Sequence, residues 1–154
     1  MNAWPAILVD TNVLVYSYDP RDQDKRGQAQ AVMAHLVRAD QAVLSTQCLV
    51  EFYNTVTRRL PERMPGDLAL AQVERLARLC RVIPMTPSAV LEGCRGSLQH
   101  QMSLWDALIW AVAKLNQVPY VLTEDAEHGR FLEGVRYLNP FAPEFDLRVL
   151  GGGS

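Results

Sequence analysis

The sequence predicts an α/β fold in which a central parallel sheet of about five strands is flanked by helices on both faces. Short, solidly apolar runs occur along the chain, and such runs are typical of strands buried on both faces of a sheet. Stretches with apolar residues at helical spacing alternate with these runs, which is typical of parallel sheets. The 154 residues, 49% of them hydrophobic, suffice for one domain with a real core, and we expect it to span residues 1–150.

The first half of the chain is expected to contain two strands and three helices. From the N-terminus these are a strand at Ile7–Val9, a helix at 24–38, a strand at 41–45, a helix at 46–60 and a helix at 67–79. Ser45 or Thr46 can cap the second helix and Asp67 the third, because their side-chain oxygens accept hydrogen bonds from free backbone N–H groups. The Pro65-Gly66 pair breaks the chain between these two helices.

The second half continues the alternation. Its expected elements are a strand at 81–85, a helix at 88–98, a helix at Leu104–Leu115, a strand at 120–123, a short helix at 126–132 and a strand at Val135–Leu138. Ser103 caps the second of these helices, and Glu133-Gly134 forms the turn into the last strand. The GGGS segment at 151–154 is interpreted as a flexible linker outside the fold.

Charge and composition exclude several classes of protein. The net charge of -2 means that any nucleic-acid binding must use a local basic patch. The three cysteines show no CxxC spacing and are odd in number, which favours reduced thiols in a cytoplasm over disulfides or a zinc site. The longest apolar stretch, Leu104–Leu115, is shorter than the ~20 residues that cross a bilayer and contains Asp106 and Lys114. We therefore expect a cytoplasmic protein without a membrane span.

Four acidic residues belong to segments that should meet at one edge of the predicted sheet. Asp10 directly follows the first strand, and Asp125 comes just after the fourth. Glu51 lies near the start of the helix that leaves the second strand, and Asp106 lies in the first turn of the helix that leads into the fourth. Ligands of open α/β sheets collect at the carboxyl edge of the strands. Because four carboxylates repel one another, their convergence predicts a bound cation, and all-oxygen ligands favour Mg²⁺ or Mn²⁺.

Each of these acids also has an interpretation that needs no metal. Asp10 could simply end a strand, and Glu51 could belong to a solvated polar stripe on its helix. Asp106 could complete a capping box with Ser103, and Asp125 could cap the short helix that follows it. All four interpretations would have to hold independently, so the pattern as a whole favours a site.

Four sequence blocks in order resemble the PIN domain family, and the resemblance runs over residues 7–141. The blocks are VDTNVLVY around Asp10, EFYN beginning at Glu51, SLWDAL around Asp106 and LTEDAEHG around Asp125, with VRYLNPF following. PIN domains are metal-dependent ribonucleases, and small bacterial members resemble VapC-type toxins of toxin–antitoxin pairs. The resemblance implies a PIN-like fold, hydrolysis of RNA phosphodiester bonds to leave 5′-phosphate and 3′-hydroxyl ends, a homodimer, and an antitoxin protein as partner.

The same resemblance implies roles for individual residues. The expected metal ligands and catalytic groups are Asp10, Glu51, Asp106 and Asp125. Glu124 competes with Asp125 for the fourth position. Asn12 and Thr123 would be polar supports that hydrogen-bond the acids or a metal-bound water. If Asp125 is the ligand, Glu124 would be a third such support.

An arginine cluster just after the Glu51 helix is the candidate RNA-binding patch. It consists of Arg58, Arg59 and Arg63. RNA phosphates require such charges near the acids, although a solvated surface would also explain them.

The sequence fits three other classes of protein less well than a nuclease. A phosphatase of the haloacid-dehalogenase type needs a second aspartate two residues after the first, and this chain has Asn12 there. A response-regulator receiver needs an aspartate at the end of its third strand, and the segment RVIPMTP at 81–87 has no acid. A PIN-like binding module without catalysis remains an alternative. Metal-dependent cleavage that is lost in Asp106→Asn distinguishes the nuclease from this module.

Overall fold

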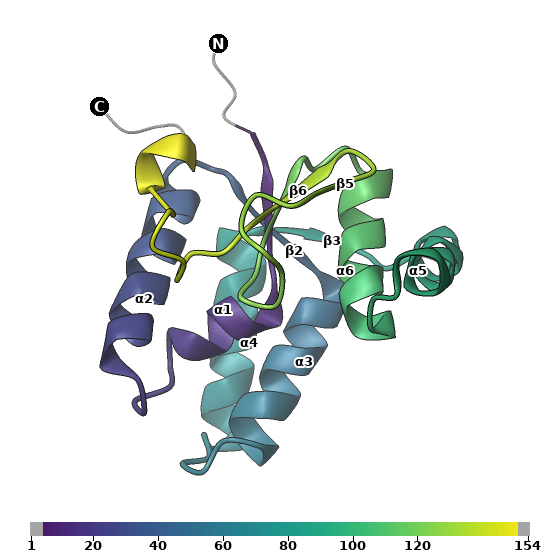
Figure 1. The fold of residues 1–154 in the computed structure, drawn as a ribbon. Coiled ribbons are helices and arrows are strands. Elements are labelled where there is room, and N and C mark those ends of the chain that lie inside the picture. The colour runs from purple at the N-terminus through teal and green to yellow at the C-terminus, as the bar shows by residue number, and fades with distance from the viewer. Residues whose placement is uncertain (1–4, 151–154) are drawn as a thin grey trace.

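The structure is a computed structural model that describes residues 5–150, and it contains a six-stranded sheet flanked by helices (Figure 1). The strands are β1 (Ile7–Val9), β2 (Ala42–Ser45), β3 (Arg81–Ile83), β4 (Tyr120–Leu122), β5 (Phe131–Leu132) and β6 (Val135–Leu138). Their order is β3-β2-β1-β4-β6-β5, and all neighbours are parallel except β5 and β6. The predicted α/β class and parallel sheet are confirmed. The expected linker at 151–154 lies outside the described residues.

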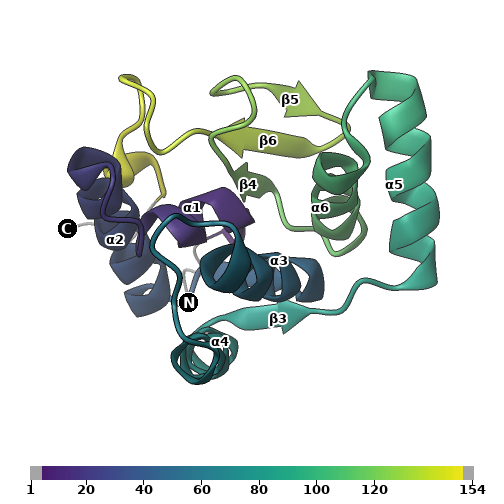
Figure 2. The ribbon, with the colours of Figure 1, turned by 90° about the horizontal axis from the view of Figure 1, so that it is seen from below.

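The helices are arranged on both sides of this sheet. They are α1 (Thr11–Tyr16), α2 (Gln23–Arg38), α3 (Thr46–Arg58), α4 (Gly66–Leu79), α5 (Pro87–His100), α6 (Leu104–Leu115) and the short 3-10 helix η1 (Leu147–Leu150). Helices α5 and α6 lie together on one side, and α2 lies on the other (Figure 2). Within residues 5–150, no helix has the length and apolar character needed to cross a membrane.

The hydrophobic core extends over both faces of the sheet, and one part of it lies where helix α6 packs between the sheet and helix α5. Trp110 of α6 is fully buried, and its indole N–H donates a hydrogen bond to the Leu132 carbonyl at 3.1 Å. Helix α5 approaches closely because it carries Gly93 and Gly96 at the crossing. A Cβ atom at Gly96 would lie 2.9 Å from Cε3 of Trp110, and one at Gly93 would lie 2.7 Å from Cδ2 of Leu108. These two glycines therefore set the distance between α5 and α6.

Helix α1 is an element that the sequence analysis did not predict. It begins directly after Asp10, which has extended backbone angles and acts as the N-cap residue. Its buried residues Val13 and Leu14 fall within a continuous apolar run of the sequence. Because a helix of six residues is too short to show a clear helical period, this run gave no signal for it.

The predicted short helix at 126–132 is wrong, because the end of that segment forms strand β5. Glu133 and Gly134 have φ angles of 46° and 90°, so they form a two-residue turn of the kind that connects hairpin strands. The turn pairs Leu132 with Val135 and Phe131 with Arg136 in an antiparallel ladder. The sheet thereby gains its sixth strand.

The predicted cap of helix α4 is also wrong. The helix begins at Gly66, one residue before Asp67, and its N-cap residue is Pro65, which makes no side-chain capping hydrogen bond. Asp67 instead lies exposed in the first turn, where its charge interacts favourably with the helix dipole. Ser45 and Ser103 do cap α3 and α6, as predicted.

The turn of the β5–β6 hairpin is tied to helices α5 and α6 through Glu133. Its carboxylate contacts His100 Nε2 at 2.6 Å, and it accepts hydrogen bonds from Arg95 at 3.0 Å and Lys114 at 3.2 Å. These contacts, with that of His100 the strongest, lower the pKa of Glu133 to about 2. The hairpin is therefore anchored by charge as well as by its strand pairing.

Replacing Glu133 with glutamine should make unfolding less dependent on pH in acid. Folding lowers the pKa of Glu133 from 4.5, so its ionised form stabilises the protein above that value, and this stability is lost as the pH falls toward 2. Because the side chain is 32% exposed, solvent screening limits the effect at pH 7 to about 1 kcal/mol. The free energies of unfolding of the wild type and of Glu133→Gln, measured with denaturant, should differ near neutral pH and converge in acid. A difference that is constant with pH would contradict this role.

Candidate metal centre

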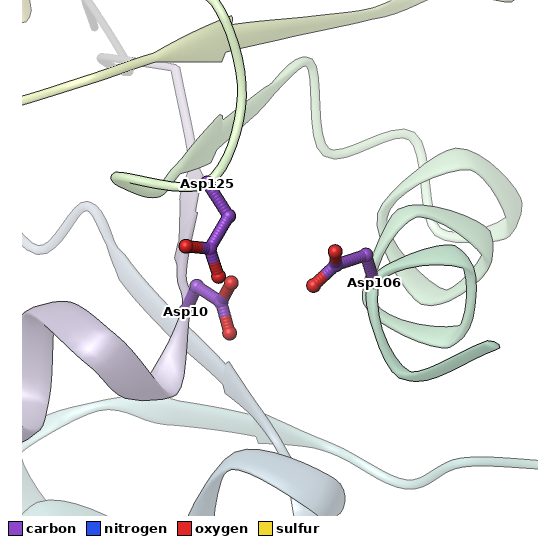
Figure 3. Close-up of side chains that lie close together, drawn as sticks. All are labelled: Asp10, Asp106 and Asp125. Carbon is purple, nitrogen blue, oxygen red and sulfur yellow. The ribbon is translucent and has the colours of Figure 1, made fainter. Parts of the chain in front are cut away.

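Three carboxylates from distant parts of the chain face one another at the carboxyl edge of the sheet (Figure 3). Asp10 follows β1, Asp125 follows β4 after a short gap, and Asp106 lies in the first turn of α6. One carboxylate oxygen of each lies within 4.8 Å of those of the other two. The parallel pairing of β1 with β4 brings Asp10 beside Asp125, and α6 brings Asp106 across from them (Figure 3).

Asp10 is the most buried of the three. Its Oδ1 accepts a hydrogen bond from the Thr11 backbone N–H at 2.7 Å, and its Oδ2 accepts one from the Thr123 hydroxyl at 2.9 Å. Burial raises the pKa of Asp10 to about 7; these two hydrogen bonds oppose the rise, and the charges of Asp106 and Asp125 reinforce it. Because folding raises this pKa, the Asp10 carboxylate reduces the free energy of unfolding as the pH rises from about 4 toward 7. A nearby cation would relieve this cost.

Asp106 uses its backbone for the helix cap and its side chain for the cluster. The Ser103 hydroxyl accepts a hydrogen bond from the Asp106 backbone N–H at 3.2 Å. Among the hydrogen bonds of residues 5–150, none joins the Asp106 carboxylate to the Ser103 backbone, so the capping box is only half formed. Burial raises the pKa of Asp106, the Ser103 side chain opposes this, and the charges of Asp125 and Glu51 reinforce it. A carboxylate held in this way carries a cost that capping does not explain.

Asn12 and Thr123 connect the acids to one another, in the positions expected of polar supports. The Asn12 amide donates hydrogen bonds to the Thr123 hydroxyl at 3.1 Å and to Oδ2 of Asp125 at 3.0 Å. The Thr123 hydroxyl donates to Asp10 and accepts from the Asp125 backbone N–H at 3.1 Å. The orientation of both carboxylates is thereby fixed by neutral groups on α1 and on the loop after β4.

Glu51 lies next to the three aspartates but is not one of the group whose oxygens converge. Its Oε2 accepts a hydrogen bond from the Thr11 hydroxyl at 2.9 Å, and its Oε1 accepts one from the Gln47 amide at 3.1 Å. Thr11 and Gln47 are site residues that the sequence analysis did not assign to it. Of these two residues, only Gln47 could have been found from the sequence, because it lies one helical turn before Glu51.

The choice between Glu124 and Asp125 is clear from their positions. Glu124 turns away from the cluster: its carboxylate accepts a hydrogen bond from the Tyr16 hydroxyl at 2.6 Å and forms an ion pair with Lys25 at 2.6 Å. Asp125 faces Asp10 (Figure 3). Glu124 therefore anchors the loop after β4 to helices α1 and α2, while Asp125 joins the cluster.

A hollow of about 1060 Å³ extends from the three aspartates along helices α3 and α4. Arg58 and Arg59 line it, together with Glu51 and the exposed ring of Trp105. Arg63, the third member of the predicted arginine cluster, is exposed in the loop before α4 and is not among the lining residues. Two of the three arginines thus share one hollow with the acids.

The donor set of the cluster fits a hard divalent cation. Its three groups offer only carboxylate oxygens, which are the ligands that Mg²⁺ and Mn²⁺ prefer. The raised pKa values of Asp10 and Asp106 indicate that this part of the fold disfavours uncompensated negative charge. The residues present are therefore suited to a metal ion, and their roles as ligands stay a prediction.

Comparison with known proteins gives a consistent result. The model of the PIN domain family matches residues 7–132. VapC20 of Mycobacterium tuberculosis, a toxin that cleaves the sarcin-ricin loop, has a TM-score of 0.61 and 21% identity over 75% of this chain and 87% of that one. A toxin–antitoxin complex from Klebsiella pneumoniae has a TM-score of 0.61 and 18% identity over 88% of this chain and 98% of that one.

A third solved structure, VapBC2 of Rickettsia felis bound to a DNA fragment from its promoter, has a TM-score of 0.59 and 12% identity. That match covers 86% of this chain and 96% of the other. No curated protein sequence matches the chain significantly. The solved structures share the fold of this chain, and their low identity carries no further conclusion.

Proposed function

The chain belongs to the PIN domain family, and from this membership we propose that it is a metal-dependent endoribonuclease and the toxin of a toxin–antitoxin pair. The observation that carries the proposal is the convergence of Asp10, Asp106 and Asp125 at the carboxyl edge of the sheet. Residues 1–150 would form the single catalytic domain. The structural neighbours include a toxin–antitoxin complex and the VapBC2 structure, and both support a protein antitoxin as partner.

In this proposal the three aspartates hold Mg²⁺ or Mn²⁺, and Glu51 completes the acidic site from the adjoining helix. The bound ion would supply a Lewis acid for the RNA phosphodiester and would lower the pKa of a water molecule. Thr123 holds Asp10 and Asn12 holds Asp125 in their orientations through the hydrogen bonds described above. Hydrolysis would add water across the bond between phosphorus and the 3′-oxygen, leaving a 5′-phosphate and a 3′-hydroxyl.

The hollow of about 1060 Å³ offers surfaces for RNA and for a protein partner. Arg58 and Arg59 line it and would bind RNA phosphates there. Its apolar side chains are exposed, with Val50 68%, Leu70 53% and Trp105 62% accessible, and such patches suit a protein partner. We propose that exposed apolar surfaces such as this one bind the antitoxin and, in a homodimer, the second copy of the chain.

The proposal is tested by incubating total cellular RNA with the purified protein in Mn²⁺, in Mg²⁺ and in EDTA. We expect discrete bands that require metal, because cleavage depends on a cation held by the acids. The Asp10→Asn variant, purified identically, controls for contaminating nucleases and should give no bands. Cleavage that persists in EDTA or in this variant would contradict the proposal. An absence of cleavage in every lane would favour a binding module.

A further inference from the structure

A second, smaller hollow lies on the side of the aspartate cluster that faces strands β4 and β6. It has a volume of about 210 Å³ and shares Asp10, Asp106 and Asp125 with the cluster. Its other lining residues include Arg130 and Tyr137. The hollow therefore brings a guanidinium and a phenolic hydroxyl together with the three acids.

The hydroxyl of Tyr137 is the unexplained group in this hollow. The residue is only 4% exposed, and its hydroxyl oxygen has no hydrogen-bond partner among residues 5–150. Burial raises the pKa of Tyr137, so the hydroxyl keeps its proton and remains a donor at neutral pH. Buried polar groups are nearly always paired, so an unpaired donor that lines a hollow indicates a ligand.

Arg130 is held beside Tyr137 by the backbone. The Tyr137 backbone N–H donates a hydrogen bond to the Arg130 carbonyl at 2.8 Å, immediately before the β5–β6 ladder. The Arg130 side chain is exposed, and none of the carboxylates among residues 5–150 forms an ion pair with it. Both residues line the same hollow, so an unpaired guanidinium and an unpaired hydroxyl are available to one ligand.

We propose that this hollow binds a phosphate group of the RNA backbone through Arg130 and Tyr137, next to the bond that is cleaved. The Arg130 guanidinium can only donate hydrogen bonds and the Tyr137 hydroxyl has a proton to donate, and an anion with several acceptor oxygens satisfies both donors at once. This assignment rests on the proposed nuclease function, since it is the RNA substrate that brings the phosphate to the cluster.

The test measures binding apart from cleavage. The probe is cytidine 3′,5′-bisphosphate in the presence of Mg²⁺, titrated into the full chain by calorimetry or NMR, because this compound has no phosphodiester bond to hydrolyse. Arg130→Gln should raise the Kd about 10-fold or more, and Tyr137→Phe should raise it about 5-fold, as expected for the loss of a charged and a neutral hydrogen bond. The melting temperature of Tyr137→Phe should not fall, because the hydroxyl has no partner in the folded chain.

Matched control variants are Arg78→Gln on the exposed face of α4 and Tyr120→Phe on β4, neither of which lines the hollow. Both should leave the Kd unchanged, and cytidine without phosphates should not compete. Wild-type protein that does not bind the bisphosphate, or a Kd that is unchanged in both Arg130→Gln and Tyr137→Phe, would overturn the phosphate site even if RNA cleavage is found. Variant-sensitive binding without RNA cleavage would uphold the phosphate site and overturn the nuclease function.

Discussion

Replacing Asp106 with asparagine should abolish RNA cleavage and, without divalent metal, raise the melting temperature. The variant removes one of three converging carboxylates, and loss of a direct ligand should cost more than the ~10- to 100-fold typical of indirect supports of metal sites. The gain in stability follows from the raised pKa of Asp106, since its charged form is disfavoured by burial and by the charges of Asp125 and Glu51. Thermal unfolding in EDTA should therefore show a higher melting temperature for the variant than for the wild type.

The same variant separates the metal role of Asp106 from a role in capping α6. The cap uses the Asp106 backbone N–H, which asparagine retains, so the helix should be unaffected. Adding Mn²⁺ should stabilise wild-type protein far more than the variant. Asp67→Asn is the matched control, because Asp67 also lies in the first turn of a helix but is exposed and does not belong to the cluster. A clear loss of melting temperature in Asp106→Asn together with retained cleavage would instead support the capping role.

Replacing Gly96 with alanine should destabilise the protein by about 2 kcal/mol, although alanine is the better helix former. The new Cβ would lie 2.9 Å from Cε3 of Trp110, and this ring is fully buried and cannot move away without disturbing the core. Overpacking costs about 1 to 3 kcal/mol, and contact with a ring that cannot move should cost close to 3, which exceeds the ~1 kcal/mol that alanine contributes to a helix by about 2 kcal/mol. The melting temperature should fall by roughly 4 to 8 °C.

Gly27→Ala provides the matched comparison for Gly96→Ala. Gly27 also lies within a long helix, α2, but a Cβ atom there would have no neighbour within 4 Å. Its replacement should therefore raise stability by about 0.5 to 1 kcal/mol. If both variants shifted the melting temperature in the same direction, the packing of α5 against Trp110 would not depend on the glycine.

The strands and most helices of this fold could be predicted because their patterns are local. The run Ile7–Val9 is solidly apolar, and the structure buries it completely as β1. Helix α1 and strand β5 were missed because they are too short to show a period, at six and two residues. Strand β5 forms because the Glu133-Gly134 turn has positive φ angles, which favour a hairpin over the expected helix.

The convergence of the acids could be predicted from topology alone, because the carboxyl ends of parallel strands meet at one edge. The hydrogen-bond and ion-pair partners of each acid could not be predicted in this way. Glu51 accepts hydrogen bonds from Thr11 and Gln47 and lies outside the group of converging oxygens, and Glu124 contacts Tyr16 and Lys25 instead. Such differences depend on the direction of each side chain, which the sequence pattern does not encode.

The two edges of the sheet bear on how copies of the chain can associate. The edge strands β3 and β5 contain three and two residues, and the exposed side chain of Arg81 begins β3. On β5, Phe131 is covered on one face by the Arg136 guanidinium, at 4.9 Å from the ring centre. Short, charged edges offer few free backbone groups for an added strand. Self-association by sheet extension, including fibril growth, is thereby discouraged, and any dimer would be built from helix faces.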